Sequence, residues 1–141
     1  MTRIDFHVGA GDKLDYAARL VRKAVGSGAK VTVTAERPVL EQFDVKLWTF
    51  AQLDFTPHVF ADSPLADVTP VLLADDPKKS PLHDVLVNLG DTVPEGFAGF
   101  ERLIELIGQA EPDKAAGRER YRHYRERGYA LTKFDIDGGA P

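Results

Sequence analysis

Apolar and polar residues alternate with a period of two at the start of the chain and then change to a helical period. Ile4, Phe6 and Val8 are separated by polar residues, which is typical of a β-strand. A glycine-rich turn follows, and Asp12 is placed to cap a helix that ends at the glycines of residues 26–28. The pattern predicts a strand followed by a helix.

The same alternation of strand-like and helical segments continues along the chain. Residues 30–35 are rich in β-branched side chains and predict a second strand, after which Pro38 opens a second helix. The apolar positions of that helix lie on one stripe: Leu40, Phe43, Leu47 and Trp48. Further strands are predicted over residues 55–60, 71–74, 84–89 and 129–134.

Three segments require separate comment. Pro57 cannot donate a ladder hydrogen bond, so residues 55–60 are expected at an edge of the sheet or to start irregularly. Residues 102–107 fit either a strand or the end of a helix begun near Glu95. Residues 111–127 predict a long polar helix that ends at Gly128.

Strands that alternate with helices predict an α/β fold, a three-layer α/β/α sandwich with a mostly parallel central sheet. The chain has 141 residues, of which 43% are hydrophobic and 28% charged, so we expect a single domain over residues 1–135 and a flexible tail over 136–141. The absence of cysteine excludes disulfides, a thiol nucleophile and cysteine-ligated zinc. We expect a cytoplasmic protein without a membrane partner, because no signal peptide or spanning segment is visible.

Catalytic motifs are nearly absent from the sequence. Gly9 and Gly11 begin a pattern that is typical of nucleotide-binding turns, but Leu14 stands where the third glycine would be. The four histidines lack the spacing of metal ligands. We therefore expect no cofactor, no metal and no catalytic activity, and the alternative is a nucleotide-binding α/β enzyme that uses the turn after the first strand.

Basic residues are concentrated in the last predicted helix, although the whole chain has a formal net charge of −4. Lys114, Arg118, Arg122 and Arg125 fall on one face of that helix, and Tyr121 lies beside them. One interpretation is a solvated helix face. The other is a binding site for a short peptide with carboxylates and an apolar end, or for single-stranded nucleic acid that pairs phosphates with arginine and stacks a base on tyrosine.

The single tryptophan gives a second candidate surface. Trp48 is close in sequence to Phe55, Pro57 and His58. A tryptophan on such a helix is commonly a core residue. The functional interpretation is a docking surface, because aromatic anchors are enriched at interface hot spots.

Three segments resemble the chi subunits of bacterial DNA polymerase III. They are Phe-Thr-Pro-His at residues 55–58 after Trp48, Arg-Glu-Arg-Tyr-Arg-His-Tyr-Arg at 118–125, and Gly-Tyr-Ala-Leu at 128–131. The resemblance covers nearly the whole chain in order, and the block at residues 118–125 is its most specific part. It implies a fold similar to mononucleotide-binding domains, without intrinsic catalysis.

The resemblance also implies partners and site residues. It implies an accessory subunit that links the clamp-loader assembly to single-stranded-DNA-binding protein by holding that protein's acidic C-terminal tail, so that contact with DNA is indirect. The residues at the matching positions of the tail site are Lys114, Arg118, Tyr121 and Arg122, with Ile107 as an apolar wall. The surface for the psi subunit, or for a repair helicase that competes for it, matches Trp48, Phe55, Pro57 and His58.

Overall fold

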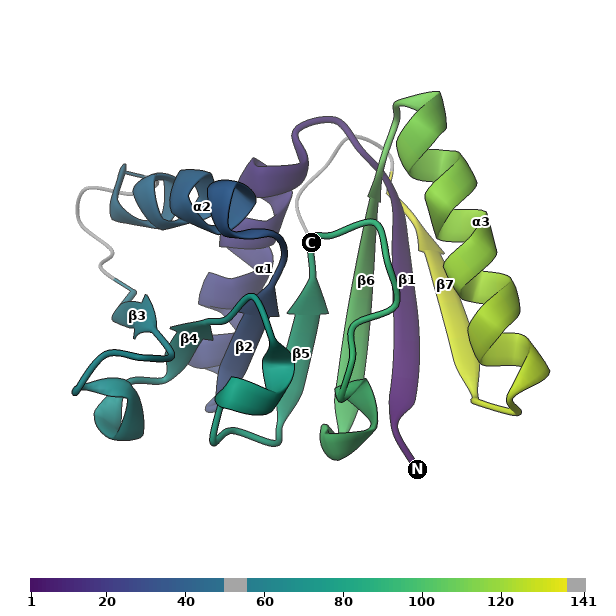
Figure 1. Cartoon of the computed structure of the whole chain (residues 1–141). Helices are drawn as coiled ribbons and strands as arrows, with labels where there is room; N and C mark the ends of the chain where they lie inside the picture. The colour runs from purple at the N-terminus through teal and green to yellow at the C-terminus, as the bar shows by residue number, and fades with distance from the viewer. Residues whose placement is uncertain (50–55, 137–141) are drawn as a thin grey trace.

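A parallel β-sheet forms the middle layer of the computed structural model, which describes residues 1–49 and 56–136 (Figure 1). Within these residues the sheet has seven strands in the order β3-β4-β2-β5-β6-β1-β7, and each neighbouring pair is parallel. The strands are β1 (Arg3–Ala10), β2 (Val31–Thr34), β3 (His58–Phe60), β4 (Val71–Leu73), β5 (Val85–Asn88), β6 (Arg102–Gly108) and β7 (Leu131–Asp135). The prediction of a mostly parallel sheet is confirmed.

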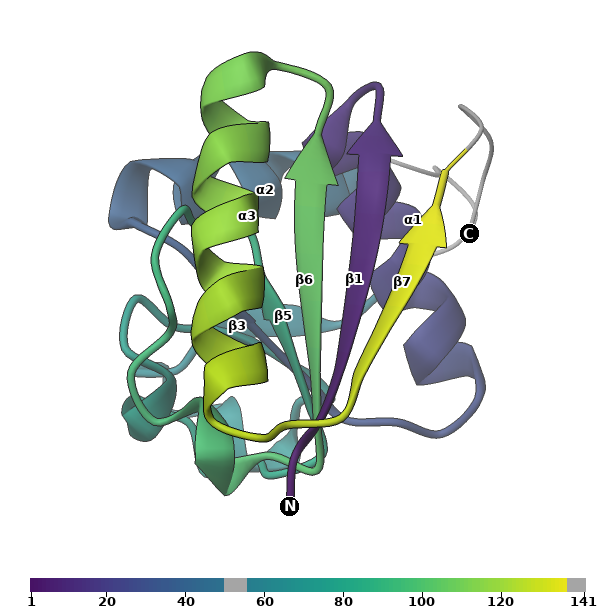
Figure 2. The same cartoon turned by 90° about the vertical axis from the view of Figure 1, so that its right-hand side faces the viewer.

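Helices cover both faces of this sheet. Helices α1 (Lys13–Gly26) and α2 (Arg37–Thr49) lie on one face, and α3 (Glu111–Glu126) lies on the other, over β1 and β6 (Figures 1 and 2). Each face has its own apolar core, one that includes Leu40 and Phe43 of α2 and one that includes Phe6 and Tyr124. The three-layer α/β/α arrangement is confirmed.

The helix ends follow the expected local chemistry. The Asp12 side chain accepts a hydrogen bond from the N–H of Asp15 at 3.0 Å and caps α1. Gly128 follows the last residues of α3 with a φ of 81°, a conformation that side-chain-bearing residues rarely adopt. The start of α1 and the end of α3 were therefore correctly predicted.

Residues 102–107 belong to a strand, so the alternative of a helix begun near Glu95 is wrong. A short 3-10 turn, Phe97–Gly99, precedes β6. Strand β6 lies between β5 and β1 and is almost wholly buried. Strands covered on both faces are near-continuously apolar, and their periodicity therefore resembles that of a buried helix.

The predicted apolar stripe of the second helix is only partly confirmed. Leu40, Phe43 and Leu47 are buried as expected, whereas Trp48 is 54% exposed, which overturns its interpretation as a core residue. Strand β3 lies at the edge of the sheet, as Pro57 predicted. Phe55 and the beginning of that predicted strand lie outside the described residues.

The last described residue lies beside the first strand. Ile136 donates its N–H to the carbonyl of Val8 at 2.8 Å, so the path of β7 continues at least to this residue. The rest of the expected tail, residues 137–141, lies outside the described part. Among the described helices, none has the length and apolar character needed to span a membrane.

Candidate functional site

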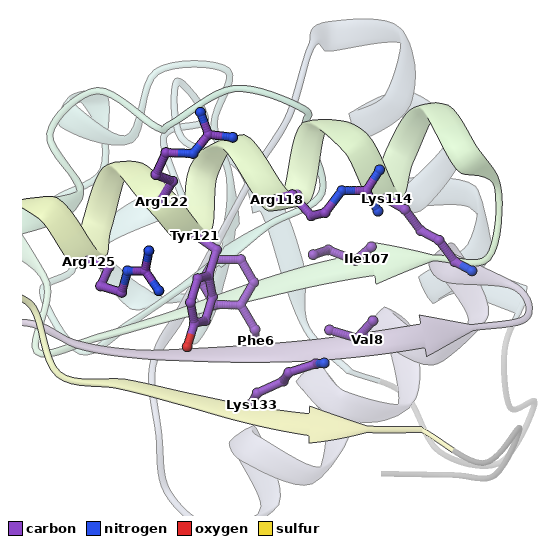
Figure 3. Close-up of a pocket in the computed structure, with 10 residues that line it drawn as sticks. Phe6, Val8, Ile107, Lys114, Arg118, Tyr121, Arg122, Arg125 and Lys133 are labelled. Atoms are coloured by element: carbon purple, nitrogen blue, oxygen red, sulfur yellow. The ribbon is translucent and has the colours of Figure 1, made fainter.

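A groove of about 520 Å³ lies between α3 and the three strands beneath it, β6, β1 and β7 (Figure 3). It contains all five residues of the predicted tail site. Ile107, Lys114, Arg118, Tyr121 and Arg122 line it together with Phe6, Val8, Gly117, Arg125 and Lys133. The structure thus brings the predicted residues to one place.

The floor of the groove is apolar. Val8 of β1 and Ile107 of β6 are neighbours in the parallel ladder, so their side chains lie side by side on the face below α3. The rings of Tyr121 and Phe6 pack edge to face, with centroids 5.1 Å apart. This floor offers an apolar side chain a place away from water.

Cations form the rim. Lys114, Arg118, Arg122 and Arg125 come from α3, and Lys133 approaches from β7 on the opposite side of Tyr121 (Figure 3). The Arg118 and Arg122 side chains are 63% and 55% exposed. An acidic ligand can therefore reach several cations at once.

Some lining residues were missed at the sequence level. Arg125 was placed on the basic face but not in the site, and Phe6, Val8 and Lys133 were not considered. Their positions depend on the pairing of β1 with both β6 and β7, which joins segments far apart in sequence. No local signal in the sequence carries that information.

A buried polar cluster fixes the rotation of α3 on the sheet. Glu105 of β6 accepts hydrogen bonds from Arg120 Nε at 3.0 Å, Tyr124 Oη at 2.5 Å and Asn88 Nδ2 at 2.9 Å. Burial raises the pKa of Glu105, and the Arg120 guanidinium opposes that rise. Because Arg120 and Tyr124 point into the protein, Arg118 and Arg122 lie on the exposed side of α3, where both border the groove.

The second predicted surface is only partly a surface. Trp48 and Pro57 are exposed, but His58 is just 4% exposed and lies under the Trp48 ring, with centroids 4.7 Å apart. His58 Nδ1–H donates to the Thr56 carbonyl at 2.6 Å, and Nε2 lies 3.1 Å from a carboxylate oxygen of Asp44. His58 therefore supports the tryptophan from below, and its prediction as a contact residue is corrected to that extent.

The turn after β1 holds internal contacts where a nucleotide-binding protein would hold phosphate. Lys13 Nζ lies 3.2 Å from the carboxylate of Asp113, and that carboxylate accepts the Gly108 N–H at 2.6 Å. These contacts join the turns that follow β1 and β6. Nor do the described residues contain a group of three or more His, Asp or Glu side chains that could hold a metal ion.

Fold and groove together define the class: a parallel α/β protein with a cationic groove suited to an acidic ligand that has an apolar part. The chain belongs to the family of DNA polymerase III chi subunits, since the family model described as "DNA polymerase III chi subunit, HolC" matches residues 1–132. Family membership makes it an accessory subunit of DNA polymerase III in DNA replication.

Individual relatives agree with this assignment. The DNA polymerase III subunit chi of Pseudomonas aeruginosa is 32% identical over 136 residues, which cover 93% of this chain and 94% of the relative. The Haemophilus influenzae subunit is 26% identical, over 86% of each chain. The Escherichia coli subunit is 27% identical, over 75% of this chain and 74% of the relative.

Proposed function

We propose that the groove beneath α3 binds the acidic C-terminal tail of single-stranded-DNA-binding protein. Through this contact the chain links the clamp-loader assembly of DNA polymerase III to the protein that coats single-stranded DNA. The observation that carries the proposal is the convergence of Ile107, Lys114, Arg118, Tyr121 and Arg122 on one groove.

Charged contacts at the rim of the groove and apolar contacts at its floor would contribute differently to binding. Exposed cations attract carboxylates over several ångströms and hold them by charge-assisted hydrogen bonds, the stronger kind. The apolar floor of Phe6, Val8 and Ile107 buries the side chain at the end of the tail, and fully burying one large apolar side chain contributes about 1.5–3 kcal/mol. A contact of this size fits an affinity of about 1 μM.

Titration of a labelled tail peptide tests the proposal. Arg118→Ala is expected to weaken binding about tenfold, because one charge-assisted hydrogen bond to an exposed guanidinium is lost. Arg127→Ala is the matched control: it removes the same charge just beyond the end of α3, where Arg127 does not line the groove. Equal affinities for the two variants would contradict the proposal.

The same titration separates a peptide ligand from a nucleic acid. Phosphates also pair with arginine, so a bare single-stranded oligonucleotide is used as a competitor for the labelled peptide. We expect the tail peptide to bind in the absence of DNA and the oligonucleotide to compete poorly, because a chain with a net charge of −4 repels a long polyanion more strongly than a short acidic peptide. An oligonucleotide that binds more tightly than the peptide would favour direct DNA binding.

We also infer that the exposed ring of Trp48, with Pro57 beside it, docks a second protein, either the psi subunit or a helicase that uses the same surface. The supporting observation is a tryptophan that is 54% exposed and held by a buried histidine. Titration with purified psi subunit tests this inference. Trp48→Ala should weaken that complex at least tenfold, and an unchanged affinity would exclude this surface as the psi-binding site.

A further inference from the structure

Two of the groove's guanidinium groups already have carboxylate partners on their own helix. Arg118 Nη2 donates to Glu111 Oε1 at 2.8 Å, and Arg122 Nη2 donates to Glu119 Oε1 at 2.9 Å. All four side chains are more than half exposed. Two arginines of the proposed tail site are therefore already paired in the free protein.

These ion pairs form in the free protein, but a ligand carboxylate can replace the glutamate in either of them. The hydrogen bond from Arg118 holds the pKa of the Glu111 carboxyl below its ordinary value, which agrees with a direct contact between the two charges. Exposed ion pairs nevertheless contribute little net free energy, because water solvates both partners well. A ligand carboxylate can replace either glutamate. Breaking the existing ion pair offsets part of the free energy that the new ion pair provides, so the ligand binds more weakly than it would to an unpaired arginine.

We propose that Glu111 and Glu119 are internal competitors that occupy Arg118 and Arg122 in the free protein and lower the affinity of the groove for acidic ligands. The proposal rests on the proposed function, since it concerns the same groove. As a consequence, the acidic partner can dissociate readily, because Glu111 or Glu119 pairs again with the arginine that the ligand leaves.

The alternative role of these residues is to stabilise the helix. Glu111 lies in the first turn of α3, where a negative charge favours the helix dipole. Glu119 lies in the middle of the helix, three residues before Arg122, where such pairs support a helix slightly. Neither of these roles predicts any change in ligand affinity, so binding distinguishes them from competition.

The test is titration of the labelled tail peptide against charge-neutral variants. Glu111→Gln and Glu119→Gln are each expected to raise the affinity about two- to fourfold, and the double variant more than either. Glu126→Gln is the matched control, because Glu126 is an exposed glutamate on the same helix that, unlike Glu111 and Glu119, forms no ion pair with Arg118 or Arg122. It removes the same charge and is expected to change the affinity less than 1.5-fold.

A double-mutant cycle shows whether each glutamate acts through its arginine. In an Arg118→Ala background, Glu111→Gln should no longer raise the affinity, because the group it competes for is gone. An equal gain for all three glutamine variants would mean that only net charge matters and would overturn the proposal, as would no gain at all. If the wild-type chain binds no tail peptide, the proposed function itself fails, which is a different result from tail binding without a gain.

Discussion

Arg120 has a role opposite to that of its neighbours on the same basic helix. Arg118 and Arg122 are exposed and border the groove, whereas Arg120 is buried against Glu105. A buried charge that loses its partner is among the most destabilising changes in a protein, because the remaining charge stays out of water. The effects of arginine substitutions on this helix should therefore differ sharply.

Arg120→Ala is expected to lower the free energy of unfolding by about 3–5 kcal/mol, because it leaves the Glu105 carboxylate buried without its guanidinium. Urea denaturation followed by circular dichroism measures this change. Arg122→Ala is the control, and since its ion pair is exposed, we expect a change of about 0.5 kcal/mol or less. Similar losses for both variants would show that burial does not distinguish them.

His7 makes stability depend on pH. Its imidazole Nδ1 is hydrogen-bonded to Tyr16 Oη at 2.6 Å, and burial lowers its pKa below the ordinary value of 6.5. The unfolded chain therefore takes up a proton before the folded chain does, so stability is retained above pH 6.5 and falls as the pH drops below it. Below the pKa of the folded state, this contribution stops changing.

Urea denaturation at a series of pH values between about 5 and 8 checks this expectation. His7→Gln should lose part of the decline in stability below pH 6.5, because the group that titrates differently is gone. His83→Gln, a substitution of an exposed histidine, should retain it. If both variants kept the full wild-type decline, the pH dependence would have to come from other groups.

For single residues, the sequence predicted much of the site but little of the buried polar cluster. Helical spacing is enough to place Lys114, Arg118, Tyr121 and Arg122 together, because three- and four-residue steps fall on one face. It could not distinguish Arg120 from the others, since what pairs with Arg120 is a glutamate on a strand and a loop carbonyl. Those partners are set by tertiary packing.

The contact between α3 and β6 depends on one glycine. A Cβ on Gly117 would lie 2.2 Å from Ile107 Cδ1 and 2.9 Å from Cγ1. The missing side chain therefore allows the helix to lie close to the strand. The same Ile107 side chain lines the groove, so this contact shapes both the packing and the site.

Gly117→Ala is expected to destabilise the fold by about 1–3 kcal/mol, because overpacking outweighs the gain of about 1 kcal/mol in helix propensity. Thermal or urea unfolding measures it. Gly26→Ala is the control, because a Cβ there meets nothing within 4 Å, and it should be neutral or slightly stabilising. Adding Ile107→Val, which removes Cδ1, should restore part of the stability lost in Gly117→Ala; no recovery would argue against the clash.

Elements with a clear period were predicted well, and those without one were not. The alternation in β1 and the cap of α1 were read correctly, whereas residues 102–107 stayed ambiguous because both faces of β6 are buried. Trp48 was placed on the buried stripe of α2 because it follows Leu47 in a helical pattern. The pattern does not show that this ring packs on His58 of the edge strand β3 and remains exposed.

The two candidate surfaces lie toward opposite edges of the sheet. Trp48 packs on His58 at the start of β3, the first strand in the sheet order, while Lys133 of β7, the last strand, lines the groove. Sites that share no residues and are well separated usually behave independently. We therefore expect no coupling between them.

Trp48→Ala should leave the affinity for the tail peptide unchanged within about 1.5-fold, and the effects of Trp48→Ala and Arg118→Ala on their respective ligands should add. Calorimetric titration of the tail peptide, with and without saturating psi subunit, measures the coupling. A change of fivefold or more in tail affinity would show that the sheet transmits binding from one edge to the other.

The class of the whole fold followed from the sequence, but the strand order did not. Alternating strands and helices favour a parallel sheet, because parallel neighbours need long crossover connections. The order requires β1 to lie between β6 and β7, which pairs Ile4 with Leu103 on one side and with Leu131 on the other. Contacts between such distant segments leave no local pattern to read.

The width of the hydrogen-bonded sheet sets the distance between its two edge strands, β3 and β7. Strands in a sheet lie about 4.8 Å apart, so the outermost of these seven are separated by about 29 Å. That distance cannot shorten unless ladders break. Any polypeptide that reached directly from a ligand at the β7 edge to a partner at the β3 edge would need about nine extended residues, so two proteins bound at these edges are held apart by the rigid domain between them.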